Sequence, residues 1–194
     1  MSGEAEQPRW IKALCGKPGA SASLAWGFAE GTVFFVVPDV LFTLTTLLRP
    51  RRGLLQLVTA VLGATVAGGV MYAWSVSAPE QARVAVAGVP HVGERMIAAT
   101  ERRWKEHGLR ALFDGPLGGV PYKVYAVLAP ARMPAGQFLL LSVPMRAERM
   151  LLSWVPFALV GLLVGRFGER RRRIALVLHA TFWIALYAYY WSAT

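Results

Sequence analysis

Long stretches without charge dominate the pattern of apolar and polar positions along the chain. Residues 53–78, 150–165 and 174–194 contain no Asp, Glu, Lys or Arg. About 20 residues, rising 1.5 Å each, span the hydrocarbon core of a bilayer. The first and third stretches therefore each predict a membrane-spanning helix. The second is short alone, but 133–145 just before it is also uncharged, so we expect one more crossing within 133–165.

Three prolines interrupt that crossing, at positions 134, 144 and 156. A straight helix over residues 133–165 would reach about 50 Å, which is longer than one crossing needs. Proline also removes a backbone donor and crowds the preceding turn. We therefore expect a short helix, a bend near Pro144 and a spanning helix that begins near Glu148.

The stretch 24–48 is equally apolar but contains two carboxylates, Glu30 and Asp39, with Pro38 just before the second. A charged Asp at the centre of a membrane helix costs about 2.5–3.5 kcal/mol on insertion scales. We interpret this stretch as a re-entrant hairpin that enters the membrane and returns. Such a backbone is tolerated where protein covers it or where it lines a wet cavity.

A second interrupted stretch covers residues 111–131. Gly115-Pro116 and Gly118-Gly119-Val120-Pro121 are expected to break any long helix, and Lys123 lies near the centre. The stretch is too broken to span a membrane and too apolar for a simple loop, so it predicts a second re-entrant hairpin.

The polar segment before it, 79–110, is expected at the surface. Within that segment, 95–107 predicts an amphipathic helix, because apolar and small side chains recur there at helical spacing.

These elements predict an all-α membrane protein with two opposed re-entrant helical hairpins, about three transmembrane helices and an interfacial amphipathic helix. A polar leader, 1–23, precedes a single integral membrane domain, 24–194. In chain order this domain comprises a re-entrant hairpin at 24–48, a spanning helix at 53–78, a surface segment at 79–110, a re-entrant hairpin at 111–131 and spanning helices within 133–165 and 174–194.

The helix at 53–78 has small residues at its centre, in the run Gly63-Ala64-Thr65-Val66-Ala67-Gly68-Gly69. Small side chains let another helix approach closely, so this run favours helix packing. A low packing demand without a specific partner is the alternative interpretation.

Basic residues are concentrated in short segments, and the formal net charge is +10. The basic segments 49–52 and 166–173 are predicted to be cytoplasmic, so the hairpin 24–48 enters from that side and 111–131 from the opposite side. The segment 79–110, placed outside, also carries six Lys or Arg, which weakens this topology. We find no groove of interleaved aromatic and basic residues, so we expect contact with anionic lipid and no nucleic acid.

Other residues that carry chemistry give few signals. Cys15 is the only cysteine, so no intrachain disulfide exists. The three histidines are scattered and form no ligand set, so we expect no metal, no cofactor and no enzyme activity. We expect His91 and His107 to be exposed and His179 to be a hydrogen-bonded packing residue. The aromatic cluster at 187–191 is expected at the level of the lipid headgroups.

Three segments, in their order and spacing, resemble the DedA family, and most closely its short YqaA-like branch. This family belongs to the superfamily that carries the VTT or "SNARE-associated Golgi protein" domain. The segments are Ala29-Glu30-Gly31-Thr32 through Pro38-Asp39-Val40-Leu41, Gly118-Gly119-Val120-Pro121-Tyr122-Lys123-Val124-Tyr125, and Ala131-Arg132-Met133-Pro134 through Phe138-Leu139-Leu140-Leu141-Ser142. They resemble the two re-entrant loops and the helix start that follows them, and cover roughly 24–165.

This resemblance implies lipid movement between leaflets, with an anionic phospholipid or a polyprenyl phosphate as substrate, and it implies dependence on protons in some bacterial members. It places the protein in the bacterial cytoplasmic membrane. The matching site residues are Glu30, Asp39, Lys123 and Arg132. The chain departs from the family in two places: residues 113–119 contain no Lys or Arg, and a Gly-Arg pair reads Met145-Arg146.

The leading interpretation is therefore a lipid transporter or scramblase. Lys123 and Arg132 would meet the anionic headgroup, while Glu30 and Asp39 would carry protons or repel the headgroup until protonated. One alternative is that these four charges pair internally and only hold the hairpins together. Another is a non-catalytic membrane scaffold for envelope maintenance, and self-association into a homo-oligomer is compatible with either function.

Overall fold

The computed structural model describes residues 8–165 and 168–192, and within these ranges the protein is helical and contains no strand. The expected all-α class is therefore confirmed for the described part. In chain order the elements are α1 Arg9–Leu14, α2 Lys17–Gly31, α3 Asp39–Leu48, α4 Pro50–Ser77, α5 Pro79–Ala87, α6 Gly93–His107, α7 Arg110–Leu117, α8 Tyr122–Leu128, the 3-10 helix η1 Ala129–Ala131, α9 Ala135–Gly165 and α10 Glu169–Ser192.

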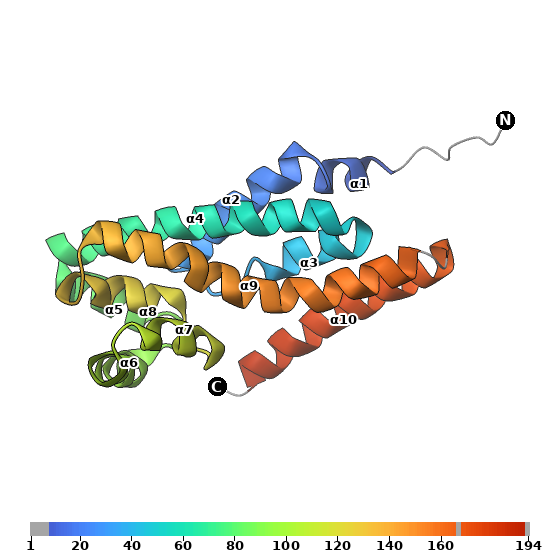
Figure 1. Ribbon diagram of the computed structural model, residues 1–194. Coiled ribbons are helices and arrows are strands. Elements are labelled where there is room, and N and C mark those ends of the chain that lie inside the picture. Colours follow the sequence, from blue (N-terminus) through green and yellow to red (C-terminus); the bar gives the residue numbers. More distant parts are fainter. Residues whose placement is uncertain (1–7, 166–167, 193–194) are drawn as a thin grey trace.

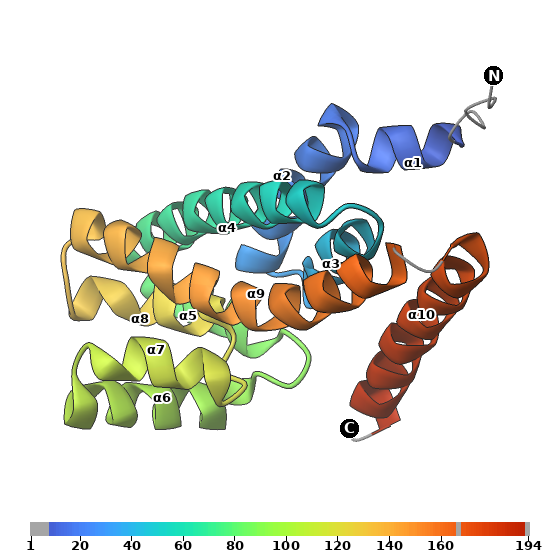
Figure 2. The ribbon, with the colours of Figure 1, turned by 45° about the vertical axis from the view of Figure 1, so that its right-hand side comes forward.

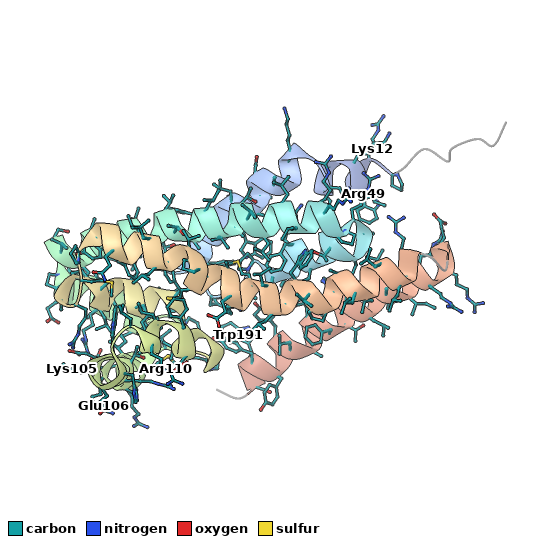
Figure 3. All side chains as sticks on the ribbon, in the orientation of Figure 1. Lys12, Arg49, Lys105, Glu106, Arg110 and Trp191 are labelled. Carbon is teal, nitrogen blue, oxygen red and sulfur yellow. The ribbon has the colours of Figure 1, made fainter. Side chains whose placement is uncertain are left out.

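Three of the helices, α4, α9 and α10, are long and apolar enough to cross a membrane. Their outer faces carry large apolar side chains, among which Val66 is 60% exposed, Leu162 57% and Ile184 70%. Charged side chains gather at the ends instead: Lys12 and Arg49 lie at one end of the bundle, and Lys105, Glu106 and Arg110 lie near the other (Figure 3). An apolar belt between charged ends is consistent with an integral membrane protein.

Two short hairpins pack against these long helices from opposite ends. In the first, α2 and α3 are joined by a tip at 32–38, and α3 leads back to the start of α4 (Figure 1). In the second, α7 and α8 are joined by a tip at 118–121 and lie near the far end of α4 (Figure 2). The two tips therefore point toward one another in the middle of the molecule.

The contact between α2 and α4 depends on small residues on both helices. A Cβ atom added to Gly27 would lie 2.1 Å from the Ala60 carbonyl oxygen, and one added to Gly63 would lie 2.0 Å from that of Leu24. Backbone therefore meets backbone here, and no side chain fits between. The expectation that the small-residue run at 63–69 accommodates a neighbouring helix is confirmed, and α2 is that neighbour.

The expected division of 133–165 is wrong. The structure has one helix, α9, over 31 residues, with Pro144 and Pro156 inside it. Each proline removes a single backbone hydrogen bond, and the turns on both sides keep theirs. Ending the helix would leave several polar groups unsatisfied among apolar side chains, which costs more than one bond. The prolines instead accompany a change of direction in the middle part of α9 (Figures 1 and 2).

Other helix limits also differ from expectation. Helix α2 begins at Lys17, inside the stretch expected to be a polar leader, because Gly16 precedes it and Pro18 suits its first turn. Helix α7 continues through Gly115 and Pro116, so only the segment 118–121 breaks the second hairpin.

The last helix begins earlier than expected as well. Helix α10 starts at Glu169 and includes the basic run 170–173, which we expected in a loop. Glu169 in the first turn complements the helix dipole and pairs with Arg173 one turn later, at 3.4 Å. Residues 166–167, the start of the predicted basic loop, lie outside the described residues.

The amphipathic character expected of 95–107 is confirmed in α6, which buries Ile97, Thr100 and Trp104 on one face. Its position at a membrane interface stays a prediction.

The expectation for His91 is wrong: this residue is half-buried, and its ring lies 3.7 Å from that of Tyr190, between centroids. The chain turns at His91 with a φ of 63°, which directs the ring inward.

Most of the aromatic cluster at 187–191 contacts other parts of the protein instead of forming a belt; the Trp191 ring, for example, lies 5.1 Å from that of Phe35, between centroids. The Tyr187 hydroxyl accepts a hydrogen bond from the Val37 amide at 2.9 Å, and the Tyr190 hydroxyl donates to the Pro90 carbonyl at 3.1 Å. Tyr189 is 72% exposed, as a belt residue would be. The end of α10 is thereby attached to the tip of the first hairpin.

We predict that Gly63→Ala lowers the stability of the protein, although alanine has a higher helix propensity than glycine. The added methyl group must push α2 away from α4, and overpacking of this kind costs about 1–3 kcal/mol. The matched control is Gly69→Ala in the same helix, where the nearest atom outside the glycine's neighbours would lie at 3.4 Å. Thermal unfolding in detergent should show a lower midpoint for Gly63→Ala and an equal or higher one for Gly69→Ala. Equal midpoints for both variants would contradict the backbone contact.

Candidate functional site

The two hairpin tips meet at a cavity of about 180 Å³ inside the helical bundle. Lys123, at the start of α8, donates from Nζ to the Phe34 carbonyl oxygen in the first tip at 2.7 Å. The cavity lies beside this contact. Its charged lining comes from three elements and consists of Glu30, Lys123, Arg146 and Arg149. The space is large enough for several waters or one small anionic group.

Glu30 forms the first of two buried ion pairs. The Arg146 guanidinium donates from Nη2 to Glu30 Oε2, and the two residues are only 3% and 5% exposed. Glu30 comes from the last turn of α2 and Arg146 from α9, so the pair joins the first hairpin to a long helix. Because both charges are buried, each depends on the other for its stabilisation.

Asp39 forms the second pair. Arg149 donates from Nη2 to Asp39 Oδ2 at 2.5 Å, and the Ser153 hydroxyl donates to Oδ1 at 2.6 Å. Asp39 is the first residue of α3 and is 1% exposed. A carboxylate at a helix N-terminus is favoured by the helix dipole. Arg149 is one turn from Arg146, so a single face of α9 supplies the partners of both acids.

The helix dipoles disfavour the charges of Glu30 and Lys123 at their positions. Glu30 lies at the C-terminal end of α2, where the partial charge is negative, and Lys123 lies at the N-terminal end of α8, where it is positive. Neither helix would favour its charge in isolation. Both charges are held by partners from other elements, so they reflect the assembled site rather than helix formation.

The Tyr122 ring contacts the Arg146 guanidinium. The Arg146 guanidinium carbon lies 5.2 Å from the centre of the Tyr122 ring, within range of a cation–π contact. The Tyr122 hydroxyl donates to Ser142 Oγ at 2.7 Å and is accommodated by Gly68, where a Cβ would lie 1.8 Å from that hydroxyl. The orientation of Arg146 is thus constrained from two sides.

The cavity has more donors than its own residues use. Arg146 Nε is buried and has no hydrogen-bond partner among the described residues. Lys123 uses one of its three N–H groups on Phe34. Three cations face two carboxylates here, so the formal charge of the cluster is +1. A buried donor without a partner is costly, so the residues of this cluster leave part of their donor capacity unused.

Arg132 lies elsewhere. Its guanidinium donates to Glu101 Oε1 at 3.3 Å, and it lines a separate cavity of about 220 Å³ that shares no lining residue with the first. The structure therefore brings together Glu30, Asp39 and Lys123 but not Arg132.

Arg83 lines the second cavity as well. There the hydrogen bond to the Glu94 carboxylate raises the pKa of the Arg83 guanidinium above its already high ordinary value.

Sequence reasoning missed the two arginines that pair with the acids. Arg146 was noted only as part of a departure from a family pattern, and Arg149 was not considered. One signal could have identified them: a buried carboxylate needs a cation, and Arg146 and Arg149 are one helical turn apart within a segment, 133–165, whose only other charged residue is Glu148.

His179 is buried, as expected, and hydrogen-bonded: Nε2 lies 2.9 Å from Thr43 Oγ1 and 3.1 Å from Trp183 Nε1. The contact with Thr43 attaches α10 to α3, whereas the contact with Trp183 lies within α10. Within the described ranges no three side chains of His, Cys, Asp or Glu lie close enough to hold a metal ion.

No protein-family model, curated protein or solved structure matches this chain. The chemistry of the charged cavity is therefore the basis for assigning a function.

We predict that Arg146→Met destabilises the protein by about 3–5 kcal/mol, because it leaves the Glu30 carboxylate buried without a partner. The control, Arg132→Met, breaks a partly exposed pair and should cost at most about 1 kcal/mol. Denaturant unfolding of both variants in detergent measures the difference. The double variant Glu30→Gln/Arg146→Met should recover part of the loss. Equal effects of the two single variants would show that the buried pair has no special weight.

Proposed function

We propose that the protein is an integral membrane transporter or scramblase that moves an anionic, phosphate-bearing lipid between leaflets. The charged cavity carries this proposal. It is lined by both hairpins and by the apolar helices α9 and α10, its charged cluster is net positive, and the buried Arg146 Nε beside it has no partner among the described residues. A purely structural ion-pair network would be expected to satisfy its own donors. The three segments that resemble the DedA family support the same function.

Helix length supports a re-entrant placement of the hairpins. Helix α2 is about 22 Å long, α3 about 15 Å and α8 about 10 Å, whereas the hydrocarbon core is about 30 Å thick. None of the three can cross it alone. Hairpins that enter from opposite faces and meet near the midplane are a common way to build a transport site.

In the proposed mechanism, the headgroup phosphate enters the cavity and accepts hydrogen bonds from the Arg146 guanidinium and Lys123 Nζ. The Glu30 carboxylate competes with it for Arg146, since both are anions. Protonation of Glu30 would weaken that competition and release the guanidinium to the phosphate. Loss of the proton would restore the internal pair and release the lipid, which couples lipid movement to protons. Asp39, held by Arg149 and Ser153, keeps the first tip in place.

Reconstitution tests this function. In liposomes that contain fluorescent phosphatidylglycerol, the wild-type protein should speed the exchange of the label between leaflets, measured by dithionite quenching. Lys123→Met removes a cavity cation while keeping the side-chain length, and should lower the initial rate by about tenfold or more, as expected when a charge-assisted hydrogen bond to the substrate is lost. The control is Lys105→Met, at an exposed position on α6.

Two results would contradict the proposal. If the wild-type protein moves neither phosphatidylglycerol nor a fluorescent polyprenyl phosphate, with or without a proton gradient, the protein is not a lipid transporter and the scaffold function gains support. If folded Lys123→Met protein moves lipid as fast as the wild type, the headgroup does not pass through this cavity.

A further inference from the structure

Two adjoining cavities of about 610 and 480 Å³ lie between α9 and α10, beside the charged cavity. Both are lined by Phe157 of α9 and Phe182 of α10, whose ring centroids lie 6.2 Å apart. We call the two cavities together the α9–α10 groove. Its walls are mostly apolar and aromatic, with Asp39 and Arg149 at the inner end and Arg171 at the other.

One end of the groove opens on the charged cavity. Arg149 lines both spaces, as do Val37 and Gly119 of the two hairpin tips. At this end, the hydrogen bonds of Tyr187 to Val37 and of Tyr190 to Pro90 attach α10 to the rest of the protein. The groove is thus a mostly apolar space whose inner end, lined by Asp39 and Arg149, adjoins the cluster of net charge +1.

We propose that the α9–α10 groove holds a hydrocarbon chain of the lipid whose anionic headgroup lies in the charged cavity; this inference rests on the proposed function. An apolar space joined to a cluster of net charge +1 complements a molecule that is apolar along its length and anionic at one end. Along α10 the groove extends from Arg171 to Tyr190, about 28 Å at 1.5 Å per residue. This length is close to the thickness of the hydrocarbon core, about 30 Å.

The inner end of the groove does not suit a partner helix. The contacts of Tyr187 and Tyr190 at that end would prevent a continuous helix from passing along α10. A flexible hydrocarbon chain can bend around such contacts. The middle of α10 is held as well, because His179 contacts Thr43 and the Phe157 ring packs against Phe182.

Photo-crosslinking tests where the chain lies. The wild-type protein is reconstituted with phosphatidylglycerol that carries a diazirine at the end of one acyl chain, and cross-linked peptides are identified by mass spectrometry. We expect adducts around Phe157 on α9 and Phe182 on α10. We expect few on the outer face of α4 around Val66, which is equally apolar and 60% exposed. Adducts spread evenly over both surfaces would overturn the inference, because they would reflect general contact with lipid.

Groove-filling variants connect the groove to transport. Leu186→Trp places a larger side chain in the groove, and Ile184→Trp is the matched control on the outward face of the same helix, 70% exposed. We expect Leu186→Trp to lose the groove adducts and to slow lipid exchange by about tenfold, since the chain and the indole compete for one space. Ile184→Trp should behave like the wild type. Thermal unfolding of both variants checks that they fold.

The possible failures are distinguishable. If the wild type moves lipid and folded Leu186→Trp moves it equally fast with unchanged adducts, the groove inference is wrong and the proposed function stands. If the wild type moves no lipid, the proposed function is wrong and the groove inference falls with it as a statement about transport. Parallel assays with phosphatidylglycerol and a one-chain polyprenyl phosphate show which lipid supplies the chain.

Discussion

Two carboxylates buried in an apolar helical bundle are the constraint on which this structure depends. Neither Glu30 nor Asp39 has access to bulk water, so each needs a cation close by, and α9 supplies both through Arg146 and Arg149. Breaking either pair leaves a buried charge, which costs far more than a surface pair would. These two contacts therefore determine where the first hairpin lies against α9, while the close backbone contact of α2 with α4 fixes its other side.

The second hairpin and α10 are both attached to the tip of the first hairpin. Lys123 joins the two tips through the Phe34 carbonyl, and Tyr187 joins the first tip to α10 through the Val37 amide. The same charges that organise the bundle also surround its central cavity. A ligand that competes for Arg146 would therefore act on the position of the first hairpin as well. In the function proposed above, this would couple headgroup binding to a change in structure.

Sequence alone identified much of the fold because its signals are local. Uncharged runs locate α4 and α10, and the acids and glycines near Pro38 and Pro121 locate the hairpin tips. The rest depends on three-dimensional pairing. No local pattern shows that Arg146 and Arg149 approach residues more than 100 positions away, or that Arg132 pairs with Glu101 instead. The continuity of α9 through two prolines likewise reflects surroundings that penalise broken backbone hydrogen bonds more than a bend.

The most direct test of the account is the accessibility of the two hairpin tips from water. In a Cys15→Ser background, Phe35→Cys and Val120→Cys are each treated with a membrane-impermeant maleimide on one or the other side of sealed vesicles, with Leu162→Cys as the lipid-facing reference. Because both tips line one wet, charged cavity, positions 35 and 120 are predicted to label from the same side, the one to which the cavity opens, and both faster than 162. Labelling of the two positions from opposite sides, or neither faster than 162, would contradict the account.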